Sequence, residues 1–451
     1  MGHARAALAC PTRVGYRGSV KKTGGHRVLR VATVAWSALL GALGCASERP
    51  GGPATVTVSG SVLGAEGRIL RRQLERFDRE TPDIRVEMRP TPDAADLRHQ
   101  LYVQWLNARA TDPDILQVDA IWTPEFAAAG WILPLDRFAP DTAAFFPVTI
   151  EANRWRGDLF ALPWFVDVGM LYWRTDLFSE PPETWDALER AVIPIVAGGS
   201  PRYGLVWQGA RYEGLVTVFL EYLGGFGGRI LDGDRVTVQE PPGVLALTTM
   251  RDQIHRTGVV PRRVLTWHEE EPRFAFQNGE AALMRNWPYA AGPMQDSTQS
   301  RVAGRFAVAP MPAGPGGRHT AAFGGAQLAI NAFSPEAAAA WLVIEYLTRP
   351  EQMLERASIV GQFPTRTAVY DDPALADALA IPPAQARAIV EAAVPRPVTP
   401  VYTQLSEILQ IQLHRALSLQ AEPRDALARA GSEMQALLDR AGLGRGGVAV
   451  R

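Results

Sequence analysis

The sequence predicts an α/β fold in which helices cover a parallel β-sheet, and three observations support it. Short β-branched strands alternate with amphipathic helices from residue 54 to residue 120. A strand–helix–strand order needs a crossover connection, which gives parallel strands with helices on the faces of the sheet. The chain has 451 residues, 47% of them hydrophobic, which is enough for two or three domain-sized units. No internal repeat or long low-complexity segment interrupts the alternation.

The first part of the mature chain carries this alternation most clearly. The predicted elements are strand 54–60, helix 67–81, strand 82–90, helix 96–111 and strand 113–120. In the first helix, apolar residues recur at helical spacing while Arg and Glu fill the other face: Ile69, Leu70, Leu74 and Phe77. Open sheets of this kind bind ligands at the carboxyl ends of their strands. Glu66, at a strand-to-helix junction, and Asp119, at a strand end, are therefore candidate ligand contacts.

Beyond residue 175 the chain becomes more helical. The predicted elements are helices 183–192, 215–225 and 243–258, a helix–turn–strand unit over 271–287, a strand region over 321–334 and a helix over 335–352. Near the C-terminus one helical face carries a leucine-rich stripe, which we interpret as core packing: Leu405, Ile408, Leu409, Leu413 and Leu417. The last residues, 444–451, are predicted to be a loose tail.

Charge and composition exclude several functions. The formal net charge of -1 gives no electrostatic basis for binding nucleic acid or an acidic substrate. The seven His and two Cys have no CxxC or HxxxH spacing, so we expect no metal site. No sequence feature calls for a cofactor.

The N-terminus has the pattern of a secretory signal. Basic residues precede an apolar stretch from Val31 to Leu43, which is too short to span a bilayer of about 30 Å. The run ends at Cys45, and residues 46–53 form a tether rich in Pro and Gly. Residues 1–45 thus resemble the signal and lipobox of a bacterial lipoprotein. Ala42 and Leu43 depart from the usual order of a lipobox, and a plain secreted protein is the alternative.

Familiar catalytic motifs are absent or incomplete. The segment GGFGGR (224–229) lacks P-loop spacing and follows a helix, so a helix cap and turn is the better interpretation. The segment HEEEP (268–272) has no second His four residues on, and we interpret it as a solvated acidic turn. No G-x-S-x-G elbow is present. A pair of acids for glycoside hydrolysis is not excluded, because the distance between two such carboxyl groups depends on the fold and not on their positions in the sequence.

The segment ALPWFVDVGMLYW (161–173) places one carboxylate, Asp167, among aromatic and aliphatic residues. A buried charge is costly unless it is paired or used, so Asp167 is a candidate ligand contact. The chain has twelve Trp, and several lie beside polar residues: Trp122, Trp164, Trp173, Trp267 and Trp287. Sugars suit such places, because their hydroxyls pair with carboxylates and their C–H faces lie against aromatic rings.

Five segments, in the same order, resemble those of ABC-importer solute-binding proteins (family 1), in particular trehalose/maltose-binding lipoproteins. They are 114–136, 156–177, 274–290, 361–370 and 396–410. The resemblance implies a type II, two-lobed periplasmic-binding-protein-like α/β fold with hinge strands and a ligand cleft between the lobes. It implies one lobe from 54–163 and 310–350, and another from 164–309 and 351–443. The expected function is to deliver a di- or oligosaccharide to a membrane permease.

The resemblance also implies which residues contact the sugar. Glu66, Asp119 and Asp167 match the acids of this branch, and Phe165 lines the wall. Trp287 matches a stacking tryptophan, and Arg366 an arginine that forks onto hydroxyls. Gly324 and Gly325 bring backbone close to the ligand.

One departure concerns the residue after these glycines. Relatives commonly have tryptophan there, whereas this chain has Ala326, which is expected to enlarge that side of the pocket and puts trehalose or maltose in doubt. The alternatives are a secreted glycoside hydrolase and a same-fold receptor for a non-sugar solute such as a polyol or glycerophosphodiester. The expected state is a monomer outside the cytoplasm, bound to the membrane through lipidated Cys45 or free in the periplasm.

Overall fold

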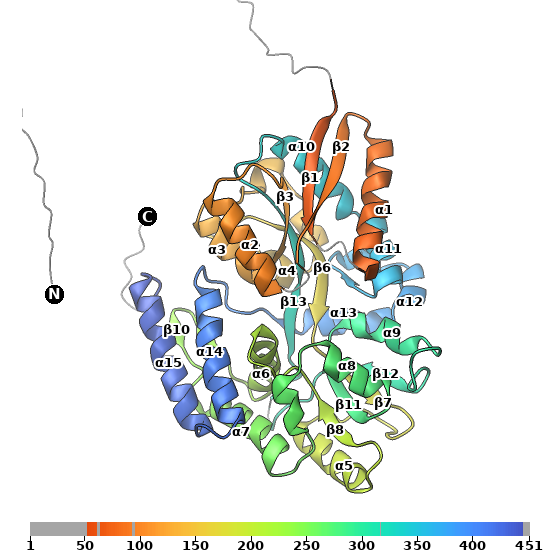
Figure 1. Ribbon diagram of the computed structural model, residues 1–451, viewed down its shortest axis with the longest axis vertical. Helices are drawn as coiled ribbons and strands as arrows, with labels where there is room; N and C mark the ends of the chain where they lie inside the picture. Colours follow the sequence, from red (N-terminus) through yellow and green to blue (C-terminus); the bar gives the residue numbers. More distant parts are fainter. Residues whose placement is uncertain (1–51, 61–63, 93–94, 316, 445–451) are drawn as a thin grey trace, which may run out of the picture. The chain divides into compact units, whose positions relative to one another are not determined.

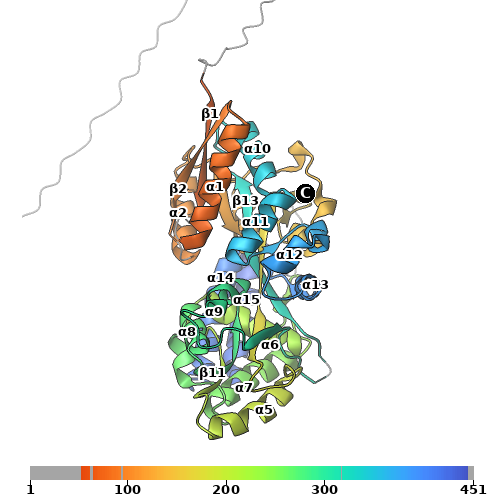
Figure 2. The same ribbon diagram turned by 90° about the vertical axis from the view of Figure 1, so that its right-hand side faces the viewer.

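Two β-sheets organise the chain, each covered by its own helices (Figures 1 and 2). The structure is a computed structural model, which describes residues 52–60, 64–92, 95–315 and 317–444. The predicted signal segment, Cys45, most of the tether and nearly all of the tail lie outside the described residues. No described helix has the length and apolar character needed to cross a membrane.

The first sheet has the strand order β14-β6-β13-β3-β1-β2, with β15 paired to β13. Its strands are β1 (Ala54–Gly60), β2 (Ile84–Pro90), β3 (Ile115–Asp119), β6 (Leu162–Val168), β13 (Ala321–Ile330), β14 (Phe363–Pro364) and β15 (Ala393–Val394). Strands β1, β2 and β3 are parallel, as the alternation of elements predicts. The sheet as a whole is mixed, because β13 enters antiparallel between β3 and β6.

The helices grouped with the first sheet are α1 (Gly64–Glu80), α2 (Ala95–Asn107), α3 (Thr123–Ala128), α4 (Pro147–Glu151), α10 (Ala337–Leu347) and α11 (Pro350–Val360). The apolar stripe predicted for the first helix is confirmed, since its four residues are at most 3% exposed. The prediction of one helix over 335–352 is wrong. Pro350 starts a new helix, and Arg349 before it is extended (ψ 151°), as the residue before a proline prefers.

The second sheet has the order β12-β7-β11-β8. Its strands are β7 (Met170–Arg174), β8 (Tyr203–Val206), β11 (Ala281–Asn286) and β12 (Phe306–Ala309). The helices on this side are α5 (Trp185–Ala197), α6 (Glu213–Gly225), α7 (Pro241–His255), α8 (Glu270–Gln277) and α9 (Ala291–Gln295). The predicted helices 183–192, 215–225 and 243–258 correspond to α5, α6 and α7, and the GGFGGR segment forms the end of α6 and the turn after it, as interpreted.

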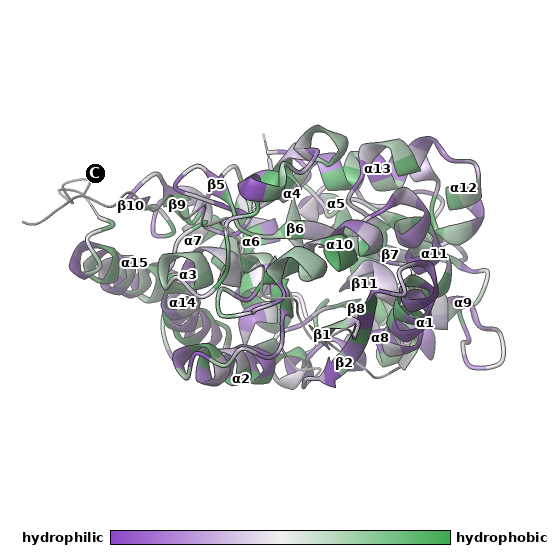
Figure 3. Cartoon of the chain, turned by 90° about the horizontal axis from the view of Figure 1, so that it is seen from above, coloured by the Kyte–Doolittle hydropathy of each residue, from purple (hydrophilic) through white to green (hydrophobic). Residues whose placement is uncertain are grey.

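The C-terminal part is helical: α12 (Ala374–Ala378), α13 (Pro383–Glu391), α14 (Tyr402–Leu417) and α15 (Pro423–Arg440). The two short hairpins are β4 (Arg154–Trp155) with β5 (Asp158–Leu159) and β9 (Leu231–Asp232) with β10 (Arg235–Val236). Helix α14 packs on α6, α7 and α15, and its leucine stripe is part of that core, which confirms the packing interpretation. In Figure 3, α14 and α15 show alternating hydrophilic and hydrophobic stretches, as helices with one buried face do.

The chain passes from the first sheet to the second at Gly169, which separates β6 from β7. A Cβ at this position would lie 1.6 Å from Glu221 Oε1 and 2.6 Å from Arg285 Nη2, so only glycine fits. The predicted lobe boundaries as a whole stay a prediction. Helix α11 packs on α1 and β14, although the predicted boundaries assign residues after 350 to the second lobe.

Candidate functional site

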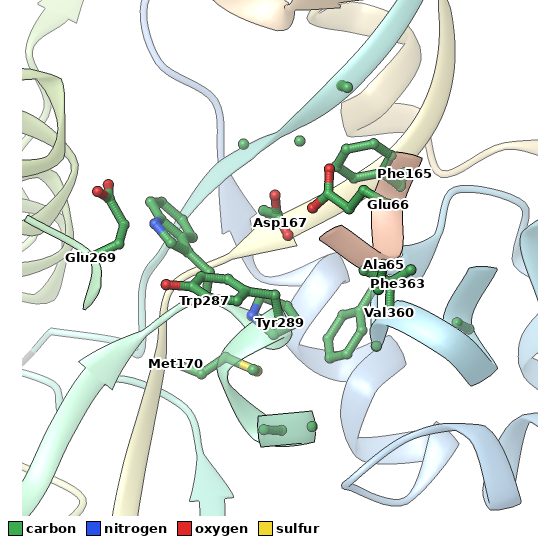
Figure 4. Close-up of a pocket in the computed structure, with 18 of the residues that line it drawn as sticks. Ala65, Glu66, Phe165, Asp167, Met170, Glu269, Trp287, Tyr289, Val360 and Phe363 are labelled. Atoms are coloured by element: carbon green, nitrogen blue, oxygen red, sulfur yellow. The ribbon is translucent and has the colours of Figure 1, made fainter. Parts of the chain in front are cut away.

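A cavity of about 1480 Å³ lies between elements of the two sheets (Figure 4). It is lined from the first sheet and its helices by β3, β6, β13, α1, α2 and α11, and from the second by residues around α6, α8 and β11. Seven of the eight predicted ligand contacts line it: Glu66, Asp119, Phe165, Asp167, Trp287, Gly324 and Gly325. Residues far apart in the sequence are thus brought to one cavity, as an interlobe site requires.

Asp167 lies in β6, two residues before the crossing at Gly169. Its Oδ1 atom is buried and has no hydrogen-bond partner among the described residues. The pKa of this carboxyl is raised to about 7, first by burial and then by the charges of Glu66 and Asp119, against the opposing charges of Arg356 and Arg285. A buried polar atom without a hydrogen-bond partner costs free energy, so a ligand that donates a hydrogen bond to this oxygen would be bound favourably.

Asp119 ends β3 and is held by two donors. Its Oδ1 accepts from Ile121 N at 3.2 Å and from Arg396 Nη2 at 2.6 Å. The same guanidinium donates through Nη1 to Glu213 Oε1 at 3.1 Å, at the first residue of α6. Arg396 is 6% exposed and lines the cavity, so it joins an acid of the first sheet to an acid beside the second.

Arg366 is the one predicted ligand contact that the structure does not bring to the cavity. Its Nε donates to the Thr348 carbonyl at 2.6 Å, and its guanidinium lies 4.4 Å from the centre of the Phe145 ring. These contacts hold the side chain away from the ligand space. Two other arginines, Arg98 and Arg396, line the cavity. Arg396 lies in the segment 396–410, one of those on which the resemblance rests, so the sequence held a signal for it.

Trp287 supplies an aromatic wall with a rigid mount. Its ring lies over the Arg285 guanidinium, 3.8 Å from the carbon Cζ to the ring centre. Arg285 is fully buried and pairs with the equally buried Glu221 at 2.5 Å. Tyr172 donates its hydroxyl to the Trp287 carbonyl at 2.7 Å. One face of the ring is therefore backed by a fixed cation, and the half-buried side chain also faces the cavity.

Phe165 forms another part of the wall, and its ring is also backed by an arginine. The centres of the Trp164 and Phe165 rings are 5.4 Å apart, and the Arg356 guanidinium lies 4.0 Å from the first and 5.2 Å from the second. Arg356 donates to Gln362 Oε1 and is 2% exposed, and burial lowers its pKa to about 10. The guanidinium thus stays charged at neutral pH and acts on Asp167 from behind the wall.

The two glycines of β13 have different roles. Gly325 has a φ of +103°, and a Cβ there would lie 2.2 Å from the Phe165 carbonyl oxygen and 2.9 Å from Asp167 N. The β13–β6 register shifts just beyond it, between Ala326 and Gln327. A Cβ on Gly324 would meet only ordinary contacts, the nearest at 3.5 Å. Gly325 therefore lets β13 approach the strand that carries Asp167.

We expect Gly325→Ala to lower the free energy of unfolding by at least about 1–3 kcal/mol, because it adds backbone strain to a steric clash. Gly324→Ala, one residue earlier, is the matched control and should change it by less than about 1 kcal/mol. Urea denaturation followed by circular dichroism measures both. Equal losses in the two variants would contradict the role given to Gly325.

The HEEEP segment is largely exposed to solvent, as its interpretation as a solvated acidic turn expects, and His268 and Glu270 are both exposed. The sequence did not predict that it also contributes to the cavity. His268, Glu269 and Glu270 line the cavity, since α8 begins at Glu270 and points its first turn at the ligand space. The tertiary fold decides this, because the acidic run itself has the composition of a surface turn. Tyr212 and Tyr289, which sequence reasoning did not single out, line the same part of the cavity.

The chemistry of the lining favours a neutral, hydroxyl-rich ligand. Carboxylates accept hydrogen bonds from hydroxyls, arginines donate hydrogen bonds, and the aromatic rings of Phe165 and Trp287 offer apolar faces. No group of three or more metal-ligating side chains occurs within the part of the chain that the structure describes.

Comparison with known proteins identifies the family. The model of the family described as bacterial extracellular solute-binding protein matches residues 61–354. The chain belongs to this family. It is 36% identical over 358 residues to a probable ABC transporter-binding protein of Deinococcus radiodurans, covering 76% of this chain and 84% of that protein. The predicted family resemblance is thereby confirmed.

Solved structures agree on the fold. A maltose-bound structure of T. maritima MalE3 has a TM-score of 0.79 and 42% identity, covering 85% of this chain and all of that one. The GacH receptor of Streptomyces glaucescens has a TM-score of 0.76 and 26% identity, covering 86% of this chain and 99% of that one. That receptor was solved unliganded and with acarbose. The predicted two-lobed α/β fold is confirmed.

Proposed function

We propose that this solute-binding protein is the receptor of an ABC sugar importer and binds a di- or oligosaccharide in the cavity between its lobes. The observation that carries the proposal is that an unpaired acceptor and an aromatic ring line the same cavity. Asp167 presents a buried oxygen without a partner, and Trp287 presents an aromatic ring mounted on Arg285. A sugar satisfies both, because it donates hydroxyls to a carboxylate and lays C–H faces on a ring.

The relatives support a sugar related to maltose. T. maritima MalE3 was solved with maltose, and the GacH receptor with acarbose and an acarbose homologue. Lobe closure around the sugar would present a changed surface to the permease, which is how domain closure transmits ligand occupancy. We further propose an extracytoplasmic location with attachment through lipidated Cys45, by its resemblance to a lipobox. Labelling cells with a radioactive fatty acid tests the anchor, and Cys45→Ser should lose the label.

Isothermal titration calorimetry of residues 52–451 against glucose, maltose, trehalose and maltotriose tests the binding function. Trp287→Ala should weaken binding about 10- to 100-fold, because the ring supplies stacking area and has a fixed orientation. Trp155→Ala is the control, since Trp155 lies in hairpin β4–β5 away from the cavity lining. If no sugar binds, or if Trp287→Ala binds as tightly as the parent protein, the assignment of the site fails.

A second candidate is a glycoside hydrolase, since Asp119 and Asp167 both line the cavity. Asp167 with its raised pKa has the character of a general acid. Two observations oppose the hydrolase: Asp119 is paired with Arg396, and the relatives of the chain are binding proteins. Turnover of chromogenic glycosides would support the hydrolase and overturn the receptor proposal. Binding of a polyol or a glycerophosphodiester in place of sugars would favour a same-fold receptor for another solute.

A further inference from the structure

The two lobes also meet outside the cavity, at a contact between helices α3 and α14 (Figure 1). Thr403 Oγ1, in the first turn of α14, donates to Glu125 Oε2 on α3 at 3.1 Å. Neither residue lines the cavity. Helix α3 shares a hydrophobic core with β3 of the first sheet, whereas α14 packs on α6 and α7. This hydrogen bond, which we call the α3–α14 contact, therefore joins one lobe to the other.

Glu125 has a fixed position on the first lobe. His99 Nε2, on α2, donates to Glu125 Oε2 at 3.0 Å, because an ionised carboxylate only accepts. The His99 ring is stacked on Phe126, with ring centres 5.7 Å apart and planes at 18°, and its centre lies 5.3 Å from that of Trp122. The His99 and Glu125 side chains are only 13% and 21% exposed. Thr403 thus meets a carboxylate that its own lobe already holds in place.

Thr403 has an equally fixed position on the second lobe, because α14 is anchored to the first residue of α6. Tyr402 Oη donates to Glu213 Oε1 at 2.7 Å, and the Ser406 hydroxyl donates to Glu213 Oε2. Tyr402 and Ser406 are both buried. They lie on either side of Thr403 in the sequence, so the turn that carries Thr403 is tied to α6.

Both sides of the contact continue into residues that line the cavity. Asp119 ends β3, and the chain runs from it through the 3-10 turn Ala120–Trp122 directly into α3. Asp119 Oδ1 caps that turn by accepting from Ile121 N. On the other lobe, the anchor of α14 is Glu213, which itself lines the cavity. Short, hydrogen-bonded connections thus join the contact to the cavity on both lobes, so a lobe movement that opens the cavity also acts on the contact.

We infer that the α3–α14 contact holds the lobes in the arrangement in which both line the cavity, and so raises sugar affinity without touching the sugar. The inference rests on the proposed function and deepens it. The apparent affinity of a protein depends on the fraction of molecules in the binding-competent arrangement. A hydrogen bond made in that arrangement alone increases this fraction. The increase is the same for every sugar, because neither Glu125 nor Thr403 reaches the ligand space.

Calorimetry of residues 52–451 with glucose, maltose and maltotriose tests this inference in Thr403→Val, which removes the hydroxyl and keeps the branched shape. All sugars that bind the parent should lose affinity by one common factor of about 2- to 5-fold, the strength of a single hydrogen bond. Thr403→Ser keeps a hydroxyl and should bind like the parent. Glu125→Ala removes the acceptor, and adding Thr403→Val to it should cause no further loss, because the bond is already absent.

Spin-label distances test the lobe arrangement directly. Residues 52–451 contain no Cys, so labels at Arg85→Cys on β2 and Arg429→Cys on α15 report one distance between the lobes. The two native side chains are 66% and 58% exposed. In the ligand-free protein, double electron–electron resonance should show a larger share of separated lobes in Thr403→Val than in the parent. Saturating sugar should restore the distance distribution of the parent.

The outcomes separate the inference from the proposed function. Unchanged or tighter binding in Thr403→Val, different factors for different sugars, or an unchanged distance distribution would each overturn the inference and leave the receptor function intact. Lack of binding of any sugar to the parent would overturn the proposed function, and the distances would still decide whether the contact holds the lobes. Thermal unfolding of Thr403→Val, expected within about 2 °C of the parent for an exposed change, keeps a folding defect from mimicking the effect.

Discussion

Asp167→Asn is expected to weaken sugar binding about 10- to 100-fold at pH 8, because it removes a charged acceptor from a buried site. The Oδ1 atom of Asp167 has no hydrogen-bond partner among the described residues, and under the proposed function a ligand hydroxyl is expected to donate to it. The amide of asparagine keeps the shape of the side chain but loses its charge. Calorimetry with the sugar that binds the parent most tightly measures the loss.

The pH dependence of binding follows from the same carboxyl. Its pKa of about 7 results first from burial and then from Glu66 on α1 and Asp119 on β3, against Arg356 on α11 and Arg285 on β11. Asp167 is therefore mostly ionised at pH 8 and mostly protonated at pH 6. If the ionised form binds, affinity should fall about tenfold between these pH values. Asp167→Asn should flatten this profile, and an equally steep profile in the variant would assign the titration to another group.

The same substitution should stabilise the ligand-free protein. The folded pKa of Asp167 is raised above the ordinary value of 3.8, so its favourable contribution is present at low pH and is lost as pH rises through 7. At pH 8 the ionised carboxyl costs the folded state up to about 4 kcal/mol. Asp167→Asn should thus raise the free energy of unfolding at pH 8, with a gain that shrinks toward pH 4. Urea denaturation at both pH values measures it, and a loss of stability at pH 8 would contradict the assigned cost.

Weaker binding together with greater stability on substitution is typical of a binding residue whose surroundings disfavour its ionised form. A residue selected for packing would show loss of stability on substitution, whereas a residue kept for its ligand shows loss of binding and gain of stability. The pair of measurements therefore separates the two roles of Asp167 more sharply than either one does alone.

Elements that depend on local sequence patterns could be predicted, whereas those that depend on contacts between distant segments could not. Alternating strands and helices are local patterns, so β1, α1, β2, α2 and β3 could be predicted from periodicity. The entry of β13 between β3 and β6 depends on pairing between residues about 155 to 215 positions apart, which no local pattern encodes. The break between α10 and α11 could have been predicted, since Pro350 favours a helix start.

The site divides in the same way. Asp167 is distinctive because it is a lone charge in an apolar run, and Trp287 because it lies beside a polar residue and matches a stacking tryptophan of the resembled family. The acids of the HEEEP segment have ordinary sequence surroundings, and only the folded chain brings them to the cavity, whereas Arg396 lies in a segment on which the resemblance rests. Arg366 follows a recognisable segment, yet its side chain is held by the Thr348 carbonyl and lies over Phe145. Resemblance can identify a segment of a site, whereas side-chain direction depends on tertiary contacts.

The buried pair Glu221–Arg285 should be the most stability-sensitive feature of the structure. Both side chains are 0% exposed, and the guanidinium makes two hydrogen bonds to the carboxylate, at 2.5 and 2.8 Å. Removing one partner leaves a buried charge uncompensated, so Arg285→Met is expected to cost about 3–5 kcal/mol in the free energy of unfolding. Urea denaturation of the ligand-free protein provides the measurement.

The pair does more than fill space, because it joins the crossing between the sheets to the aromatic wall. Glu221 on α6 also accepts from Ala322 N of β13 at 3.3 Å, and the pair occupies the space that a side chain on Gly169 would need. Arg285 supports the Trp287 ring from one face. Arg285→Met should therefore weaken sugar binding as well as stability, since Trp287 loses its fixed mount.

A double-variant cycle separates the pair from its surroundings. Glu221→Leu combined with Arg285→Met should lose at least about 1–3 kcal/mol less than the sum of the single losses, because neither charge is then left buried alone. Sugar binding should stay weakened in the double variant, since stability is partly restored while the cation behind Trp287 is still missing. Additive losses of stability would contradict the coupling between the two buried charges. Full recovery of binding in the double variant would show that Arg285 does not support the Trp287 ring.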